Sequence, residues 1–81
     1  MTTTKEEIFE LLKSNLLDIV PEIDPDQVQP EASMKDLGAN SIDRVDVILQ
    51  TIEALGLKFP LHELGELKNL QALVDNLHGR L

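Results

Sequence analysis

The chain has 81 residues and a formal net charge of −8, because 15 aspartate and glutamate residues outnumber 7 lysine and arginine residues. This length allows one small domain over residues 1–81, with a modest core and too little material for a deep catalytic cleft. The negative charge argues against binding to nucleic acid or anionic membranes and favours partners with basic surfaces, although it would also serve solubility alone.

Signals of other protein classes are missing from the sequence. Cysteine is absent, so the chain forms neither disulfides nor thiolate metal sites. The first seven residues lack a basic start with an apolar run, and no stretch approaches a membrane span. We therefore expect no signal peptide, no membrane segment and a cytoplasmic location. His62 and His78 lack metal-ligand spacing and are interpreted as surface residues.

The first predicted helix starts after Thr4 and ends at Pro21. Thr4 followed by Glu7 forms a capping box, in which each side chain binds the backbone N–H of the other residue. Proline ends a helix because it has no N–H to donate and its ring clashes with the preceding turn. The apolar stripe of this helix is Ile8, Leu11, Leu12, Leu16 and Ile19.

Residues 21–40 form an unusually long connection for so small a domain, with three prolines and no convincing periodicity. Such a loop must be held by side chains that reach the core. The expected anchors are Ile23, Val28, Met34 and Leu37. Residues 33–36 are also expected to form one helical turn before Gly38.

The strongest helical pattern runs from Ser41 to Leu55. Asn40 is a favourable N-cap residue, and Gly56 stands where a left-handed C-cap is expected. The apolar residues at helical spacing are Ile42, Val45, Ile48, Leu49, Ile52 and Leu55, on an arc of about 140°. Val47 lies apart on another side. One packed face therefore does not account for every apolar residue: the helix is buried on several sides, or some of these residues meet partners.

Two further helices are predicted after Gly56. Pro60 is placed to open a short helix over 61–64 that Gly65 stops. Asn69 caps a last helix that ends near Gly79, and its inward residues are Leu70, Leu73, Val74 and Leu77. No alternating or hairpin segment is present. The fold class is therefore all-α, a small bundle of three main helices and one short helix.

Ser41 is the strongest candidate functional residue. It stands at the start of the central helix, where unpaired N–H groups and the helix dipole stabilise an anion by roughly 0.3–1 kcal/mol at an exposed site. Gly38 and Ala39 are small enough to leave room for a sharp turn and for an approaching molecule. Taken alone, the segment Asn-Ser-Ile is also typical of an ordinary helix start.

The segment Gly38-Ala39-Asn40-Ser41-Ile42, followed by Val45 and Asp46, resembles the acyl carrier protein family, whose signature is Gly-x-Asp-Ser-Leu/Ile at the start of the second helix. Chain length, serine position, long first connection and final helix also fall where that family has them. The resemblance implies a 4′-phosphopantetheine arm on Ser41, derived from coenzyme A, whose thiol holds acyl groups as thioesters. Asn40 replaces the usual aspartate, so not every enzyme that modifies members of this family is expected to accept the chain.

The family resemblance also implies a set of partners. These are a phosphopantetheinyl transferase, a ketosynthase or hydroxymethylglutaryl-synthase-like enzyme, and acyl-handling or decarboxylating enzymes of the pathway, all meeting a monomeric carrier. The residues expected to contact them are Ile42, Asp43, Asp46, Leu49 and Glu53. The alternative is that the apolar members are ordinary core and the acids solvated charges. An apolar groove for a bound chain would be lined by Leu49, Ile52, Phe59 and Leu61, which are otherwise plain core.

The pathway is indicated by a few residues only. Asn40 and the run Ile42-Asp43-Arg44 are similar to discrete carriers of polyketide synthesis, including acetyl donors for β-branching, more than to the fatty acid carrier, which remains the alternative. Arg44 either pairs with a nearby carboxylate or distinguishes partners. An unmodified helical adaptor is also compatible with the composition. A hydrolase is disfavoured because Ser41 lacks a Gly-x-Ser-x-Gly elbow.

Overall fold

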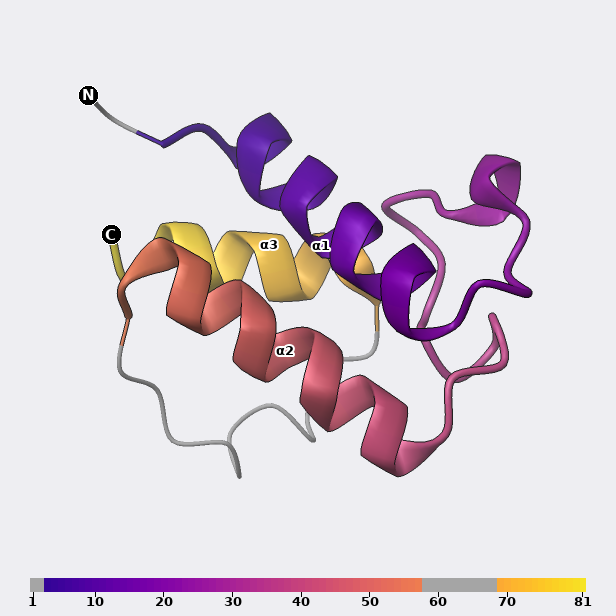
Figure 1. The fold of residues 1–81 in the computed structure, drawn as a ribbon. Coiled ribbons are helices and arrows are strands. Elements are labelled where there is room, and N and C mark those ends of the chain that lie inside the picture. Colours follow the sequence, from indigo (N-terminus) through magenta and orange to yellow (C-terminus); the bar gives the residue numbers. More distant parts are fainter. Residues whose placement is uncertain (1–2, 58–68) are drawn as a thin grey trace.

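A computed structural model describes residues 3–57 and 69–81 of the chain. These residues form α1 (Lys5–Ile19), a short 3₁₀ helix η1 (Pro25–Gln27), α2 (Ser41–Leu55) and α3 (Leu70–His78). In Figure 1, α1 and α2 run in roughly the same diagonal direction with α3 between them in this view, and the two ends of the chain lie on the left side of the molecule. The all-α prediction is confirmed; the short helix predicted over 61–64 lies outside the described residues.

Helix α1 packs against both α2 and α3. Its predicted capping box is present: Thr4 Oγ1 accepts from the Glu7 N–H at 3.2 Å, and Glu7 Oε1 accepts from the Thr4 N–H at 3.4 Å. The helix ends at Ile19, before the proline predicted to stop it. The fully buried residues of its stripe are Ile8, Leu12 and Leu16, while Leu11 and Ile19 are half-buried. This stripe is the part of α1 that joins the core.

The long connection is held to the core as predicted, since Ile23 and Val28 are buried and Met34 and Leu37 are half-buried. It also caps the start of α3, which the sequence did not indicate. The carbonyls of Pro30 and Ala32 accept from the N–H groups of Gln71 and Leu70 at 2.8 and 2.9 Å. These bonds satisfy two of the N–H groups that a helix start leaves without partners. The connection therefore sets the position of α3.

The buried side of α2 differs from the predicted arc. Val47, placed apart by the sequence pattern, has an exposed fraction of 0%, whereas Ile42 has 72%. Thr51 is also fully buried: its hydroxyl accepts from Asn15 Nδ2 of α1 at 2.9 Å and donates to the Val47 carbonyl at 2.8 Å. The sequence pattern left Val47 outside the arc without assigning it a neighbour. The bond from Asn15 to Thr51, one helical turn after Val47, shows that α1 lies along this part of α2, and side-chain spacing alone does not reveal that neighbour.

Helix α3 follows the prediction closely. Asn69 Oδ1 accepts from the Ala72 N–H at 2.8 Å, as expected of an N-cap. The four residues predicted to face inward are all buried: Leu70, Leu73, Val74 and Leu77. Gly79 ends the helix with φ −66°, whereas Gly56 after α2 takes the left-handed φ of 70°. None of the described helices is long and apolar enough to cross a membrane.

Candidate functional site

Ser41 lies at the end of a tight turn that leads into α2. The predicted helical turn is present, since the Leu37 N–H donates to the Ser33 carbonyl at 3.1 Å. Gly38 then takes φ 102°, which favours glycine because a side chain is strained there. Ala39 is buried in the core with 3% exposure, so it holds the turn in place. The chain therefore delivers Ser41 to the surface from a fixed position.

Asn40 serves as the N-cap of α2 in the position where the acyl carrier signature has an aspartate. Its Oδ1 accepts from the Asp43 N–H at 2.8 Å, and its backbone carbonyl accepts from the Arg44 N–H at 3.0 Å. Among the described residues, the N–H groups of Ser41 and Ile42 bind no protein acceptor. The replacement of aspartate by asparagine therefore leaves the cap intact, and two donors at the helix start are available to a ligand.

The surroundings of Ser41 suit a phosphodiester. Its side chain is exposed, and within the described part of the chain its hydroxyl has no hydrogen-bond partner. The positive end of the α2 dipole and the two N–H groups favour a negative group at this point. A Cβ atom added at Gly38 would meet no atom of residues 3–57 or 69–81 within 4 Å, so these residues leave the space beside the turn open. The serine can therefore be reached by a bulky reactant.

Most of the predicted partner residues lie together on one exposed side of α2. Ile42, Val45 and Leu49 have exposed fractions of 72%, 42% and 37%, and Asp46 and Glu53 are exposed beside them. At 100° per residue, these five positions cover an arc of about 100°. We call these five residues the α2 strip. Exposed apolar side chains next to carboxylates are typical of a docking surface rather than of a core.

The membership of the α2 strip differs from the sequence prediction at two residues. Val45 was assigned only to the packed arc, but it is exposed between Ile42 and Leu49, one helical turn from each. The spacing of Val45 from those two residues, three and four positions, is the sequence signal that could have placed it on this surface. Asp43 is half-buried, and its position is about 60° from Asp46 around the helix. The structure therefore adds Val45 to the predicted surface and places Asp43 beside it.

The remaining candidate residues have mixed outcomes. Ile52 is buried with 5% exposure, as its plain-core alternative predicts, while Phe59 and Leu61 lie outside the described residues. Arg44 makes no ion pair with any residue that the structure describes; its Nε donates to the Asn40 carbonyl at 3.4 Å. The expected pairing of Arg44 with a carboxylate is therefore wrong within this part of the chain. His78 is half-buried at the end of α3, and His62 is not described.

Comparison with known proteins gives a consistent result. Residues 10–77 match the family described as Phosphopantetheine attachment site. The polyketide biosynthesis acyl-carrier-protein AcpK of Bacillus subtilis (strain 168) is 38% identical over 77 residues, which cover 95% of this chain and 94% of that protein. An acyl carrier protein of Thermosynechococcus vestitus is 35% identical over 78 residues, or 95% of both chains.

A segment of a much longer protein is also similar. Methylphloroacetophenone synthase of Cladonia uncialis is 38% identical over 65 residues, which are 80% of this chain and 3% of that synthase. No solved structure matches the chain significantly. The similarity thus extends to chains of the same length and to one segment of a large synthase.

Proposed function

This chain belongs to the acyl carrier protein family, whose members carry a covalent 4′-phosphopantetheine, and from that premise we propose that Ser41 is the attachment residue. The observation that supports the proposal is the exposed, unpartnered hydroxyl of Ser41 at the capped start of α2. We further propose that residues 1–81 act as one monomeric, cytoplasmic carrier domain without catalytic activity of its own.

In the proposed modification, the Ser41 hydroxyl loses its proton and its oxygen forms a bond to a phosphorus of coenzyme A. The phosphoanhydride bond breaks, and adenosine 3′,5′-bisphosphate leaves. The N–H groups of Ser41 and Ile42 stabilise the resulting phosphodiester. When attached, the arm supplies a thiol that holds acyl groups as thioesters. The domain itself contributes a high local concentration of the tethered group and a surface for docking.

Intact-mass measurement tests this function directly. The purified chain is incubated with coenzyme A and a broad-specificity phosphopantetheinyl transferase and then weighed. A carrier gains the mass of one phosphopantetheinyl group. An unchanged mass, with an authentic carrier modified in the same reaction, would instead support the unmodified helical adaptor.

We propose that the α2 strip is where modifying and synthase enzymes dock. Replacing Asp46 and Glu53 by lysine should lower the rate of association with partner enzymes, because attraction between exposed charges mainly raises association rates. The association rate should also depend less on salt concentration. The matched control reverses Asp18 and Glu22, which are also exposed and lie outside α2. The measurement is kcat/KM of the transferase across a salt series. Equal effects of the two double variants would show a general charge effect and remove the strip assignment.

We propose that the acyl groups belong to polyketide synthesis. One relative supports this: the name of AcpK refers to polyketide biosynthesis, and the match covers 95% of this chain and 94% of AcpK. Within that pathway, Asn40 and Arg44 favour the role of an acetyl donor for β-branching. The fatty acid pathway is the alternative, since the relative from Thermosynechococcus vestitus is described only as an acyl carrier protein.

An experiment with an acetyl group loaded on the carrier distinguishes the β-branching role from the fatty acid role. It is offered in parallel to a hydroxymethylglutaryl-synthase-like branching enzyme and to a fatty acid condensing enzyme, and the acetyl group lost from the carrier is followed by mass. We expect faster use by the branching enzyme, because local charge near the serine, including Arg44, discriminates between partners. Faster use by the condensing enzyme, or equal use by both, would exclude the donor role while leaving the carrier function intact.

A further inference from the structure

A surface hollow of about 250 Å³ lies between the first half of α1 and the first half of α3. Its apolar lining comes from Phe9, Pro30 and Val74. Phe9 is the one phenylalanine among the described residues, which include no tyrosine or tryptophan, and it is half-buried at this hollow instead of enclosed in the core. Pro30 is held against α3 by the bond from the Gln71 N–H to its carbonyl. The hollow is therefore built from parts that the fold keeps in place.

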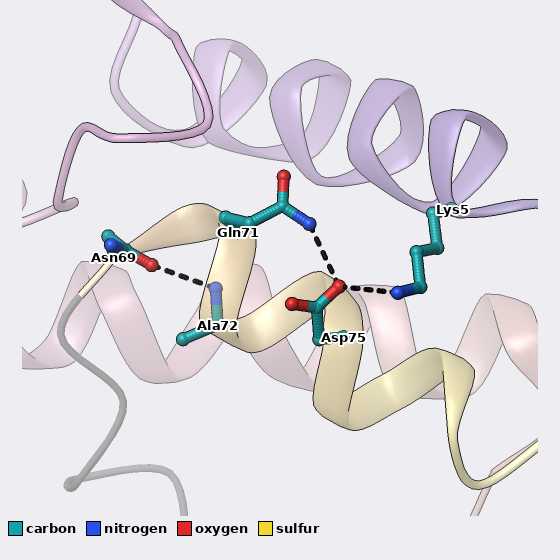
Figure 2. Close-up of polar contacts among 5 residues, drawn as sticks. All are labelled: Lys5, Asn69, Gln71, Ala72 and Asp75. Atoms are coloured by element: carbon teal, nitrogen blue, oxygen red, sulfur yellow. Dashed lines mark hydrogen bonds and ion pairs between the residues drawn. The ribbon is translucent and has the colours of Figure 1, made fainter.

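One edge of the hollow is ordered by a polar network. Figure 2 shows the side chains of Lys5 and Gln71, both of which line the hollow, directed at the same oxygen of Asp75. Lys5 Nζ lies 2.9 Å from Asp75 Oδ1, and Gln71 Nε2 donates to that oxygen at 2.8 Å. The hydrogen bond from Lys5 and, to a smaller extent, the one from Gln71 lower the pKa of Asp75 below its ordinary value. The charge of Lys5 is thereby engaged by a neighbour.

The other edge of the hollow carries two carboxylates that no described residue pairs with. Glu6 and Glu10 line it from α1, one helical turn apart, and both are exposed. Neither forms an ion pair with another residue of the described chain. Because Lys5 is paired with Asp75, the hollow presents an apolar floor beside two free carboxylates. Its chemistry is complementary to an apolar side chain next to a lysine or arginine.

The hollow is separate from the proposed attachment site. No described residue of α2 lines it. Figure 1 shows the start of α1 and the start of α2 at opposite ends of the molecule. A molecule bound in the hollow would therefore leave Ser41 and the α2 strip accessible to an enzyme.

We propose that this hollow docks a protein segment in which an apolar residue stands next to a basic residue. The apolar side chain contacts Phe9, Pro30 and Val74, and the basic side chain pairs with Glu6 and Glu10. Such a contact would hold the carrier within an assembly while its arm visits successive enzymes, because tethering raises the effective concentration without occupying α2.

The test is an amide NMR titration of the ¹⁵N-labelled full chain with two probes, acetyl-Leu-Arg-amide and acetyl-Leu-Glu-amide. The arginine peptide should cause saturable shifts of the amides in 5–10 and 71–75, and added salt should weaken them. The glutamate peptide at equal concentration should cause none. Shifts that are equal for both peptides, absent for both, or confined to α2 would overturn the proposal.

Variants give an independent check with the same probe. Reversing Glu6 and Glu10 to lysine should weaken binding of the arginine peptide by about tenfold, the effect of losing two exposed charge contacts. The control that reverses Asp18 and Glu22 has the same net charge and should bind like the unaltered chain. Ser41→Ala should also bind normally, so this result does not depend on the modification site. Equal weakening in both charge variants would overturn the proposal.

Discussion

Ser41→Ala is expected to abolish attachment of phosphopantetheine while the helical fold is kept. Alanine removes the hydroxyl oxygen that the proposed site offers to phosphorus. The helix start should survive because Asn40, not Ser41, supplies the capping oxygen. Alanine also has a higher helix propensity than serine, so the stability change should stay within about 0.5 kcal/mol. Intact mass after the transferase reaction and circular dichroism during heating measure the two effects.

The control for this experiment is Ser14→Ala, a substitution of the same kind at an exposed residue of α1. This variant should gain the arm as the unaltered chain does. If the Ser41 variant also gains it, another residue is modified and the site assignment is wrong. If neither variant nor the unaltered chain gains mass, the failure concerns the modifying reaction or the carrier function and not the choice of serine.

Aspartate at position 47 is expected to prevent folding, whereas aspartate at position 45 should be tolerated. Val47 has an exposed fraction of 0%, and a carboxylate there would be buried within the hydrophobic core. Such burial costs several kcal/mol, a large part of the roughly 5–15 kcal/mol that stabilises a typical small domain. Val45 is 42% exposed, so its replacement should change stability by about 0.5 kcal/mol or less. Circular dichroism and urea unfolding distinguish the two variants.

A milder pair of variants keeps this prediction measurable. Val47→Ala should still fold and lose about 2 kcal/mol, from the buried methyl groups and the space they leave. Val45→Ala should lose much less. Similar losses at both positions, or a larger loss at position 45, would mean that α2 buries the arc suggested by its apolar spacing and not the side that faces α1.

The ends of the helices could be predicted because capping is a local interaction. Thr4 and Glu7 are three residues apart, and Asn40 and Asn69 each bind an N–H three residues later. Residues so close in sequence meet as soon as the first helical turn forms, so the residue types are enough to identify them. The candidate serine follows from the same local signals, since its place after Asn40 puts it on the first turn.

The buried side of α2 could not be predicted in this way. Two overlapping arcs of α2 share three residues, Ile48, Ile52 and Leu55. The first arc also contains Ile42, Val45 and Leu49. The second also contains Val47 and Thr51. Hydropathy favours the first arc because threonine counts as polar. The second is buried because Asn15 of α1 supplies the hydrogen bond that a buried hydroxyl needs. That bond joins residues 36 positions apart, so no local pattern contains it.

The sequence by itself therefore determined the all-α class, the limits of the described helices and the prominence of Ser41, all of which depend on residues within a turn of one another. The tertiary structure decided which apolar residues of α2 remain exposed to solvent in the α2 strip. It also brought Phe9 and Pro30 together with Val74 in one hollow. The physical reason is the same in both cases: burial depends on which helix lies alongside, and that is set by contacts between distant parts of the chain.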